Sequence, residues 1–205
     1  MLIEQPHGLI RRLFPEALWR MDPERRSVYL TFDDGPIPEA TPYVLDVLES
    51  MDVRATFFMV GDNARKFPQL LTEVRSRGHR IGNHSFNHIG GMSRSTDKYM
   101  ENVLKAEEIL HSDKLFRPPH GWMTWGQYRA MREDGWRVVM WDVLTRDYNG
   151  TFSADMIMQN VRRHTRNGSI ITFHDSLKSI DRLHGTLPNI LTWLKQQGYE
   201  FDVFD

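Results

Sequence analysis

Short apolar runs alternate with amphipathic segments along most of the chain. The runs are rich in β-branched and aromatic residues and predict strands at 27–32, 55–60, 79–82, 114–117, 136–141, 169–174 and 199–204. Many of them are apolar at nearly every position, which is typical of strands buried in a parallel sheet. Segments with apolar residues at helical spacing lie between them, at 41–51, 65–77, 95–111, 124–134, 153–166 and 186–197. This alternation predicts repeated βα units.

Glycine marks the passage from helix to strand. Gly78, Gly135, Gly168 and Gly198 each follow a predicted helix and shortly precede a predicted strand, where a helix end often needs a left-handed residue. About seven parallel strands in 205 residues predict an α/β fold, a deformed (β/α) barrel, with an open doubly wound sheet as the alternative. We expect one catalytic domain over 27–205.

Residues 1–26 precede the first predicted strand, and we expect this extension to pack on the barrel. Its apolar residues recur at helical spacing, so a membrane-surface helix is the alternative, which Pro15 disfavours. The sequence shows no signal peptide and no apolar run long enough to span a membrane. We therefore expect a cytoplasmic protein without a transmembrane segment, although export by an unrecognised route stays open.

Composition excludes several classes of function. Lys and Arg nearly balance Asp and Glu, and the net charge is −1, so no basic field would gather nucleic acid. The chain contains no cysteine, which excludes disulfides, thiolate metal ligands and a cysteine nucleophile. Any metal ion would have to be held by histidine and carboxylate.

The unusual polar residues follow the ends of predicted strands. They are Asp33 and Asp34, then Asn83, His84 and His88, then 117–121, then Asp142 and Asp147, and finally His174 and Asp175. Because active sites of (β/α) barrels and doubly wound sheets lie at the carboxyl ends of the strands, these residues are expected to share one site.

Two histidines four residues apart, His84 and His88, can reach a single metal ion. By itself this spacing is a weak signal, and the glutamate of the H-E-x-x-H motif is absent. One of the adjacent carboxylates Asp33 and Asp34 could be the third ligand, and the other could take a proton from water. The alternative for this pair is a simple turn at the strand end, which Asp, Gly and Pro favour.

A second group of residues is suited to proton transfer. His174 could protonate a leaving group if a carboxylate kept it oriented and charged, and Asp147 or Asp142 could do so. Arg117 precedes two prolines, so a stiff extended segment would hold it, and it could pair with the aspartate that is not a metal ligand.

Taken together, the motifs "TFDDGP", "HSFNH", "RPPHG", "WDVLTRDY" and "TFHD" resemble those of the polysaccharide deacetylases of the NodB-homology type, carbohydrate esterase family four. The resemblance runs from about residue 28 to the C-terminus. It implies a metal-dependent hydrolase of carbon–nitrogen bonds that removes N-acetyl, or O-acetyl, groups from a sugar or oligosaccharide. It also implies one divalent ion, zinc with cobalt or nickel as alternatives.

The resemblance also implies roles for individual residues. Asp33 would be the catalytic base, held by Arg117, and His174 would be the acid, oriented by Asp147. The metal ligands would be Asp34, His84 and His88. A metal-bound water would attack the acetyl carbonyl, and the metal and a backbone N–H near His120 would stabilise the oxyanion.

The substrate pocket departs from the family pattern. His120 replaces a common Tyr, Tyr148 replaces a common Trp, and Thr172 replaces an aliphatic residue. We expect substrate contacts from Pro119, His120, Trp122, Tyr148 and Thr172. The aromatic residues Trp122, Trp125, Trp141 and Tyr148 could stack on sugar faces, or they could simply pack in the core.

The sequence leaves two other functions open. An amidohydrolase acting on a non-sugar amide or cyclic imide could use the same metal site, and a closed pocket would favour it. A binding module that has lost catalysis is disfavoured because the base, the acid and all three ligands are present.

Overall fold

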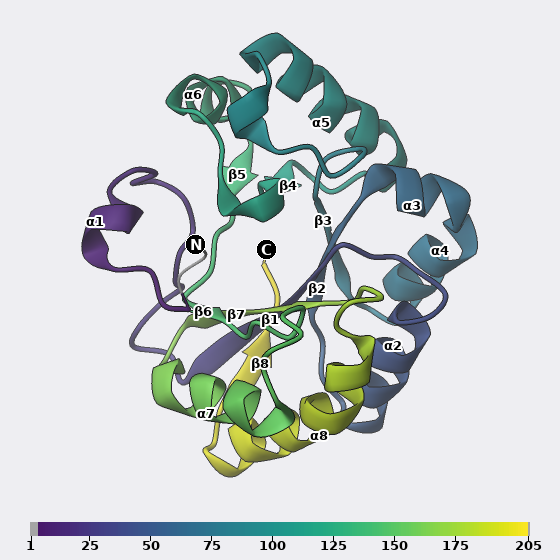
Figure 1. The fold of residues 1–205 in the computed structure, drawn as a ribbon, viewed down its shortest axis with the longest axis vertical. Helices are drawn as coiled ribbons and strands as arrows, with labels where there is room; N and C mark the ends of the chain where they lie inside the picture. Colours follow the sequence, from purple (N-terminus) through teal and green to yellow (C-terminus); the bar gives the residue numbers. More distant parts are fainter. Residues whose placement is uncertain (1–3, 205) are drawn as a thin grey trace.

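The computed structural model describes residues 4–204, which form a curled sheet of eight strands with helices around its outside (Figure 1). The strands are β1 Ser27–Asp33, β2 Thr56–Met59, β3 Arg80–Asn83, β4 Leu115–Phe116, β5 Arg137–Val138, β6 Val143–Leu144, β7 Ser169–His174 and β8 Glu200–Asp202. Their order is β5-β4-β3-β2-β1-β7-β6, with β8 added beside β1. All these pairings are parallel. The predicted deformed barrel is confirmed.

The helices follow the predicted segments with two differences. They are α1 Gly8–Arg11, α2 Thr41–Ser50, α3 Gly61–Lys66, α4 Pro68–Ser76, α5 Thr96–Leu110, α6 Trp125–Glu133, α7 Ala154–His164 and α8 Ile180–Gln196. Two short 3₁₀ turns, η1 Gly91–Ser93 and η2 Pro119–Gly121, complete the described elements. The predicted helix 65–77 is two helices, because Pro68 lacks an N–H and disfavours helical backbone at Phe67, where ψ is 60°. Helix α8 begins at Ile180 rather than at residue 186 and contains Pro188.

The predicted strand 136–141 is wrong in its extent. Strand β5 ends at Val138 on one edge of the curled sheet, and β6 begins at Val143 on the other edge. Residues 139–142 cross between the two edges and are all buried. The apolar run therefore reflects burial in the gap rather than strand pairing.

The N-terminal segment packs at this same gap. Leu18 N–H donates to Val138 O and Met140 N–H donates to Leu18 O, both at 2.8 Å. Met21 N–H donates at 2.8 Å to Gly168 O, just before β7. Residues 14–21 thus link the end of β5 to the start of β7. No helix within residues 4–204 is long and apolar enough to cross a membrane.

Alternation along β1 separates the core from the site. Val28, Leu30 and Phe32 belong to the main apolar core together with residues of α2, α4, α7 and α8. The intervening side chains point to the opposite face, since successive strand residues alternate. Among them, Thr31 and Asp33 both contact Arg117. The strand that anchors the core therefore also delivers a carboxylate to the interior of the barrel.

Candidate active site

The polar residues that follow the strands do converge, around a cavity of about 150 Å³. Its walls are formed by Asp33, Asp34, His84, His88, Arg117, Pro118, His120, Gly121, Trp141, Leu144, Tyr148, Thr172, His174 and Lys178. These residues come from the carboxyl ends of β1, β3, β4, β6 and β7 and from the segments that follow them. The structure thus places the predicted base, acid and metal ligands in one cavity.

The neighbouring carboxylates Asp33 and Asp34 point to different partners. Asp33 ends β1 in extended conformation, and its Oδ1 accepts a hydrogen bond of 2.7 Å from Arg117 Nη1. Asp34 has a left-handed backbone with φ of 84°, which turns its side chain toward the histidines. The left-handed turn therefore lets the two adjacent carboxylates face different partners within the same cavity.

Asp34, His84 and His88 form a donor set that suits a divalent cation. Their ligand atoms lie within 4.8 Å of one another; Asp34 Oδ1 is 3.7 Å from His84 Nε2 and 3.2 Å from His88 Nε2. His84 Nδ1 lies 2.8 Å from Arg117 O, so this nitrogen carries the proton and Nε2 is available to a metal. Two imidazoles and one carboxylate are ligands typical of zinc and similar ions.

The protonation states also suit metal binding. Burial lowers the pKa of His84 to about 4, so the ring is neutral near pH 7, as a ligand must be. Burial by itself would raise the pKa of Asp34, but the hydrogen bond with His88 and the charge of His174 outweigh it and lower the pKa well below its usual range. Asp34 is therefore an ionised carboxylate.

Arg117 holds Asp33 from within the protein. Its side chain is 1% exposed, and Nη1 donates to both Asp33 Oδ1 and Thr31 Oγ1 at 2.7 Å. Nη2 donates to Met140 O at 2.8 Å, and the guanidinium lies 4.2 Å from the Phe58 ring centre. Burial lowers the pKa of Arg117 and Asp33 opposes this shift. A guanidinium remains charged even so, and it fixes the carboxylate in one orientation.

His174 and Asp147 form an imidazole–carboxylate pair on the other side of the cavity. Asp147 Oδ1 lies 2.8 Å from His174 Nδ1, and Asp147 Oδ2 accepts from the His174 N–H at 2.7 Å. Burial favours neutral imidazole, but the charge of Asp147 outweighs burial and raises the pKa of His174 to about 9. The ring is therefore a cation near neutral pH, with Nδ1 donating to the carboxylate.

Asp142, the alternative partner for His174, lies elsewhere. It is fully buried, and its oxygens accept from Arg166 Nη2 at 2.7 Å and Ser169 Oγ at 2.8 Å. Arg11 of the N-terminal segment also pairs with it. Asp142 therefore anchors the crossing segment rather than the imidazole.

The residues expected to contact substrate separate into two groups. His120, Tyr148 and Thr172 line the cavity: His120 packs edge-on against His88 and Tyr148 edge-on against His174, with ring centres 4.6 and 4.7 Å apart. Pro119 is buried outside the cavity lining, and Trp122 is 37% exposed and also outside it.

The tryptophans considered for stacking on sugars also differ in position. Trp125 is 59% exposed and lies outside the cavity lining. Trp141 does line the cavity but is only 6% exposed, and it packs edge-on against Trp19 with ring centres 6.1 Å apart. Trp141 therefore packs in the core, whereas its stacking on a sugar remains an expectation.

Three contributions were missed from the sequence. Leu144 lines the cavity from β6, a strand hidden by the longer run predicted before it. Lys178 lines the cavity mouth from the turn that precedes α8, and no motif marks it. Asp175 follows His174 directly and was seen only as part of the strand end, although it holds the loop that carries Asp34.

Asp175 fastens the chain after Asp34. Its carboxylate accepts from Gly35 N–H at 3.1 Å and from Thr41 Oγ1 at 2.6 Å, while its own N–H donates to Asp33 O at 3.0 Å. Burial raises the pKa of Asp175 to about 8. These bonds tie the loop after β1 to the end of β7, next to Asp33 and Asp34 in the sequence.

We expect Gly35→Ala to disturb the site through this contact. A Cβ at Gly35 would lie 2.0 Å from Asp175 Oδ2, so the loop must shift, at a cost of about 1–3 kcal/mol of unfolding free energy. Thermal unfolding and zinc titration should show lower stability and weaker binding. Gly185→Ala is the matched control, since its Cβ would meet Ala154 at an ordinary 3.6 Å. Wild-type zinc affinity in Gly35→Ala would contradict this view of the loop.

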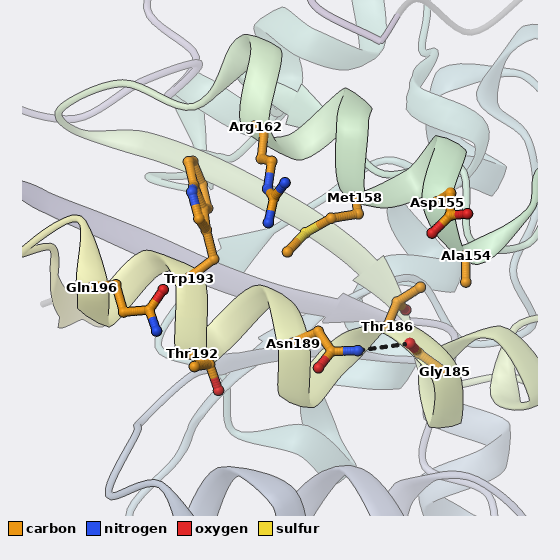
Figure 2. Close-up of a pocket in the computed structure, with 10 residues that line it drawn as sticks. All are labelled: Ala154, Asp155, Met158, Arg162, Gly185, Thr186, Asn189, Thr192, Trp193 and Gln196. Carbon is orange, nitrogen blue, oxygen red and sulfur yellow. Dashed lines mark hydrogen bonds between the residues drawn. The ribbon is translucent and has the colours of Figure 1, made fainter.

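A larger cavity of about 390 Å³ lies between α7 and α8 (Figure 2). Its lining includes Asp155, Arg162, Asn189 and Trp193, and Asn189 Nδ2 donates to Gly185 O at 3.3 Å. It contains no histidine and none of the predicted site residues. The chemistry therefore belongs to the smaller cavity at the strand ends.

The fold and the site define an α/β barrel protein in which a carboxylate held by arginine, an imidazole–carboxylate pair and a cluster of one carboxylate and two imidazoles lie at the carboxyl ends of the strands. The profile of the polysaccharide deacetylase family matches residues 20–139. The chain therefore belongs to the polysaccharide deacetylase family, as its five motifs predicted.

Three known proteins illustrate the similarity. A peptidoglycan-N-acetylglucosamine deacetylase of Bacillus cereus is 38% identical over 178 residues, covering 82% of this chain and 64% of the relative. A crystal structure of a peptidoglycan N-acetylglucosamine deacetylase has a TM-score of 0.85 and 35% identity, with 92% of this chain and 91% of that chain covered. Bacillus subtilis PdaA, a family 4 carbohydrate esterase, has a TM-score of 0.82 and 28% identity, with 98% and 90% covered. The chain thus spans just under two thirds of the first relative.

Proposed function

We propose that the protein is a metal-dependent hydrolase that removes N-acetyl groups from a carbohydrate. One observation carries this proposal: Asp33 is held by Arg117, while the adjacent Asp34 faces His84 and His88. Base and ligand functions are thereby separated within one cavity that also holds His174. The names of the similar proteins support acetylated amino sugars as the substrate class. No feature of the cavity favours a non-sugar amide over such a sugar.

The cavity residues can carry out amide hydrolysis as follows. A divalent cation held by Asp34, His84 and His88 would supply Lewis acidity, which polarises the acetyl carbonyl and acidifies water. Asp33 accepts a proton from the attacking water, and Arg117 keeps its carboxylate in place. When the carbon–nitrogen bond breaks, His174 gives its proton to the nitrogen and acetate remains. Asp147 stabilises the imidazolium before that transfer.

A backbone donor near His120 was expected to stabilise the oxyanion. The Gly121 N–H donates to Pro118 O at 3.0 Å, so it is engaged within the turn. His120 lines the cavity and has a left-handed backbone, with φ of 59°, so its own N–H is the better candidate. Donors aimed at the developing charge typically lower the activation barrier by several kcal/mol.

Acetate release provides the test. Metal-free protein is reloaded with Zn²⁺, Co²⁺ or Ni²⁺ and incubated with N-acetylglucosamine oligomers, peptidoglycan fragments and acetylated xylan. We expect metal-dependent acetate release from at least one N-acetylated glycan. Acetate released only from xylan would move the proposal to O-acetyl groups. Absence of acetate with all substrates, although metal is bound, would refute a carbohydrate deacetylase.

A further inference from the structure

Lys178 is a charged residue of the active-site cavity that the proposed mechanism does not use. It is exposed and lines the same cavity as the base, the acid and the metal ligands. Within residues 4–204 its ammonium makes no ion pair or side-chain hydrogen bond.

The backbone of Lys178 is held firmly beside the catalytic strand. The hydroxyls of Ser176 and Ser179 form a hydrogen bond of 2.9 Å, and the Ser179 N–H donates to Ser176 O at 3.1 Å. Lys178 O accepts from Arg182 Nη1 at 2.7 Å, and the same nitrogen lies 3.4 Å from Asp147 O. Through Arg182 and Ser179, the turn contacts both Asp147 and His174, so Lys178 lies next to this pair.

The other charges of the cavity are already balanced. Asp33 is paired with Arg117, and Asp147 lies against His174. A divalent ion on Asp34 would more than neutralise that carboxylate. The remaining cation at the mouth is Lys178, so the electrostatic potential there favours an anionic group on the substrate.

We propose that Lys178 selects substrates that carry a carboxylate on the acetylated sugar or on its immediate neighbour. This inference rests on the proposed deacetylase function and adds a specificity residue to it. A carboxylate close to the acetamido group would pair with the ammonium while the acetyl group enters the cavity. Neutral acetamido sugars would lack this contact and bind more weakly.

The test compares matched substrates on the zinc-loaded protein. The probe is a peptide-free oligosaccharide containing N-acetylmuramic acid, and the comparison substrates are the same oligosaccharide with its carboxyl amidated and an N-acetylglucosamine oligomer of equal length. Lys178→Gln should lower kcat/KM about fivefold on the carboxylate substrate, through KM, because exposed ion pairs contribute modestly. Lys178→Glu should lower it further, and added salt should weaken the wild-type preference.

Controls separate this inference from the function on which it rests. Lys98→Gln, an exposed lysine in the first turn of α5, should leave every rate unchanged. Both Lys178 variants should unfold at the wild-type temperature. If Lys178→Gln lowered kcat/KM equally on charged and neutral substrates, or on neither, the role of Lys178 would be overturned while the deacetylase proposal stands. Absence of acetate from wild-type protein with all three substrates would instead tell against the deacetylase itself.

Discussion

Asp33→Asn is expected to lower turnover by about 10³-fold while metal affinity stays near that of the wild type. The amide cannot accept a proton from water, and loss of a positioned base typically costs about 10²–10⁴-fold. Its oxygen can still accept the hydrogen bond that Arg117 now gives to the carboxylate. The proposed metal ligands Asp34, His84 and His88 are untouched. Acetate release and zinc titration on the same preparation measure the two effects.

His84→Ala is the counterpart to that variant, and it should lose both metal and turnover. Loss of outer-shell partners alone typically costs about 10–100-fold in metal affinity, so removal of a ligand should cost at least about 100-fold. Arg117 O would also lose its contact with His84 Nδ1. Equal metal loss in Asp33→Asn and His84→Ala would contradict the division of labour between Asp33 and Asp34.

Much of the fold and the site follows from one periodic pattern and one general rule. Alternation of apolar runs with amphipathic segments predicted the parallel sheet, and the rule that sites lie at strand ends gathered the residues of the cavity. The rule works because all paired strands run in the same direction, so residues as distant as Asp33 and His174 end side by side. Their strands pair in register at those two positions.

The features that sequence patterns missed depend on tertiary packing. Residues 139–142 are buried like a strand but bridge the two edges of the sheet, and periodicity cannot separate burial from pairing. The predicted helix 186–197 began just after Gly185, although α8 runs from Ile180. Propensity is a weak signal when apolar packing on the core outweighs it. Lys178 therefore lay outside every predicted strand and helix.

Sequence patterns also could not show whether Asp142 or Asp147 is the partner of His174. Both are buried acids within a few residues of each other, and no local pattern distinguishes a partner of His174 from a structural ion pair. The distinction comes from long-range contacts: Asp142 meets Arg11 and Arg166, whereas Asp147 meets His174. Only the curled sheet, with residues 139–142 crossing between its edges, brings these partners together.

Asp147→Asn should weaken catalysis and move its dependence on pH. Asp147 raises the pKa of His174 to about 9 against the opposing effect of burial, so the wild-type imidazole keeps its proton through neutral pH and loses it as the pH rises toward 9. Without the carboxylate charge the pKa of His174 falls, and the acid form is lost at lower pH. We therefore expect the alkaline limb of the kcat profile to move to lower pH, with kcat at pH 8 reduced about 10²-fold or more.

The measurement is kcat for acetate release across the pH range, with zinc content determined at each point. Asp142→Asn is the matched control, because it removes a buried acid of the same region that pairs with Arg166 rather than with His174. It should lower stability, since breaking a buried ion pair leaves an unpaired charge, without moving the alkaline limb. His174→Gln should abolish this limb. An unchanged limb in Asp147→Asn would show that His174 is not the group whose proton the reaction uses.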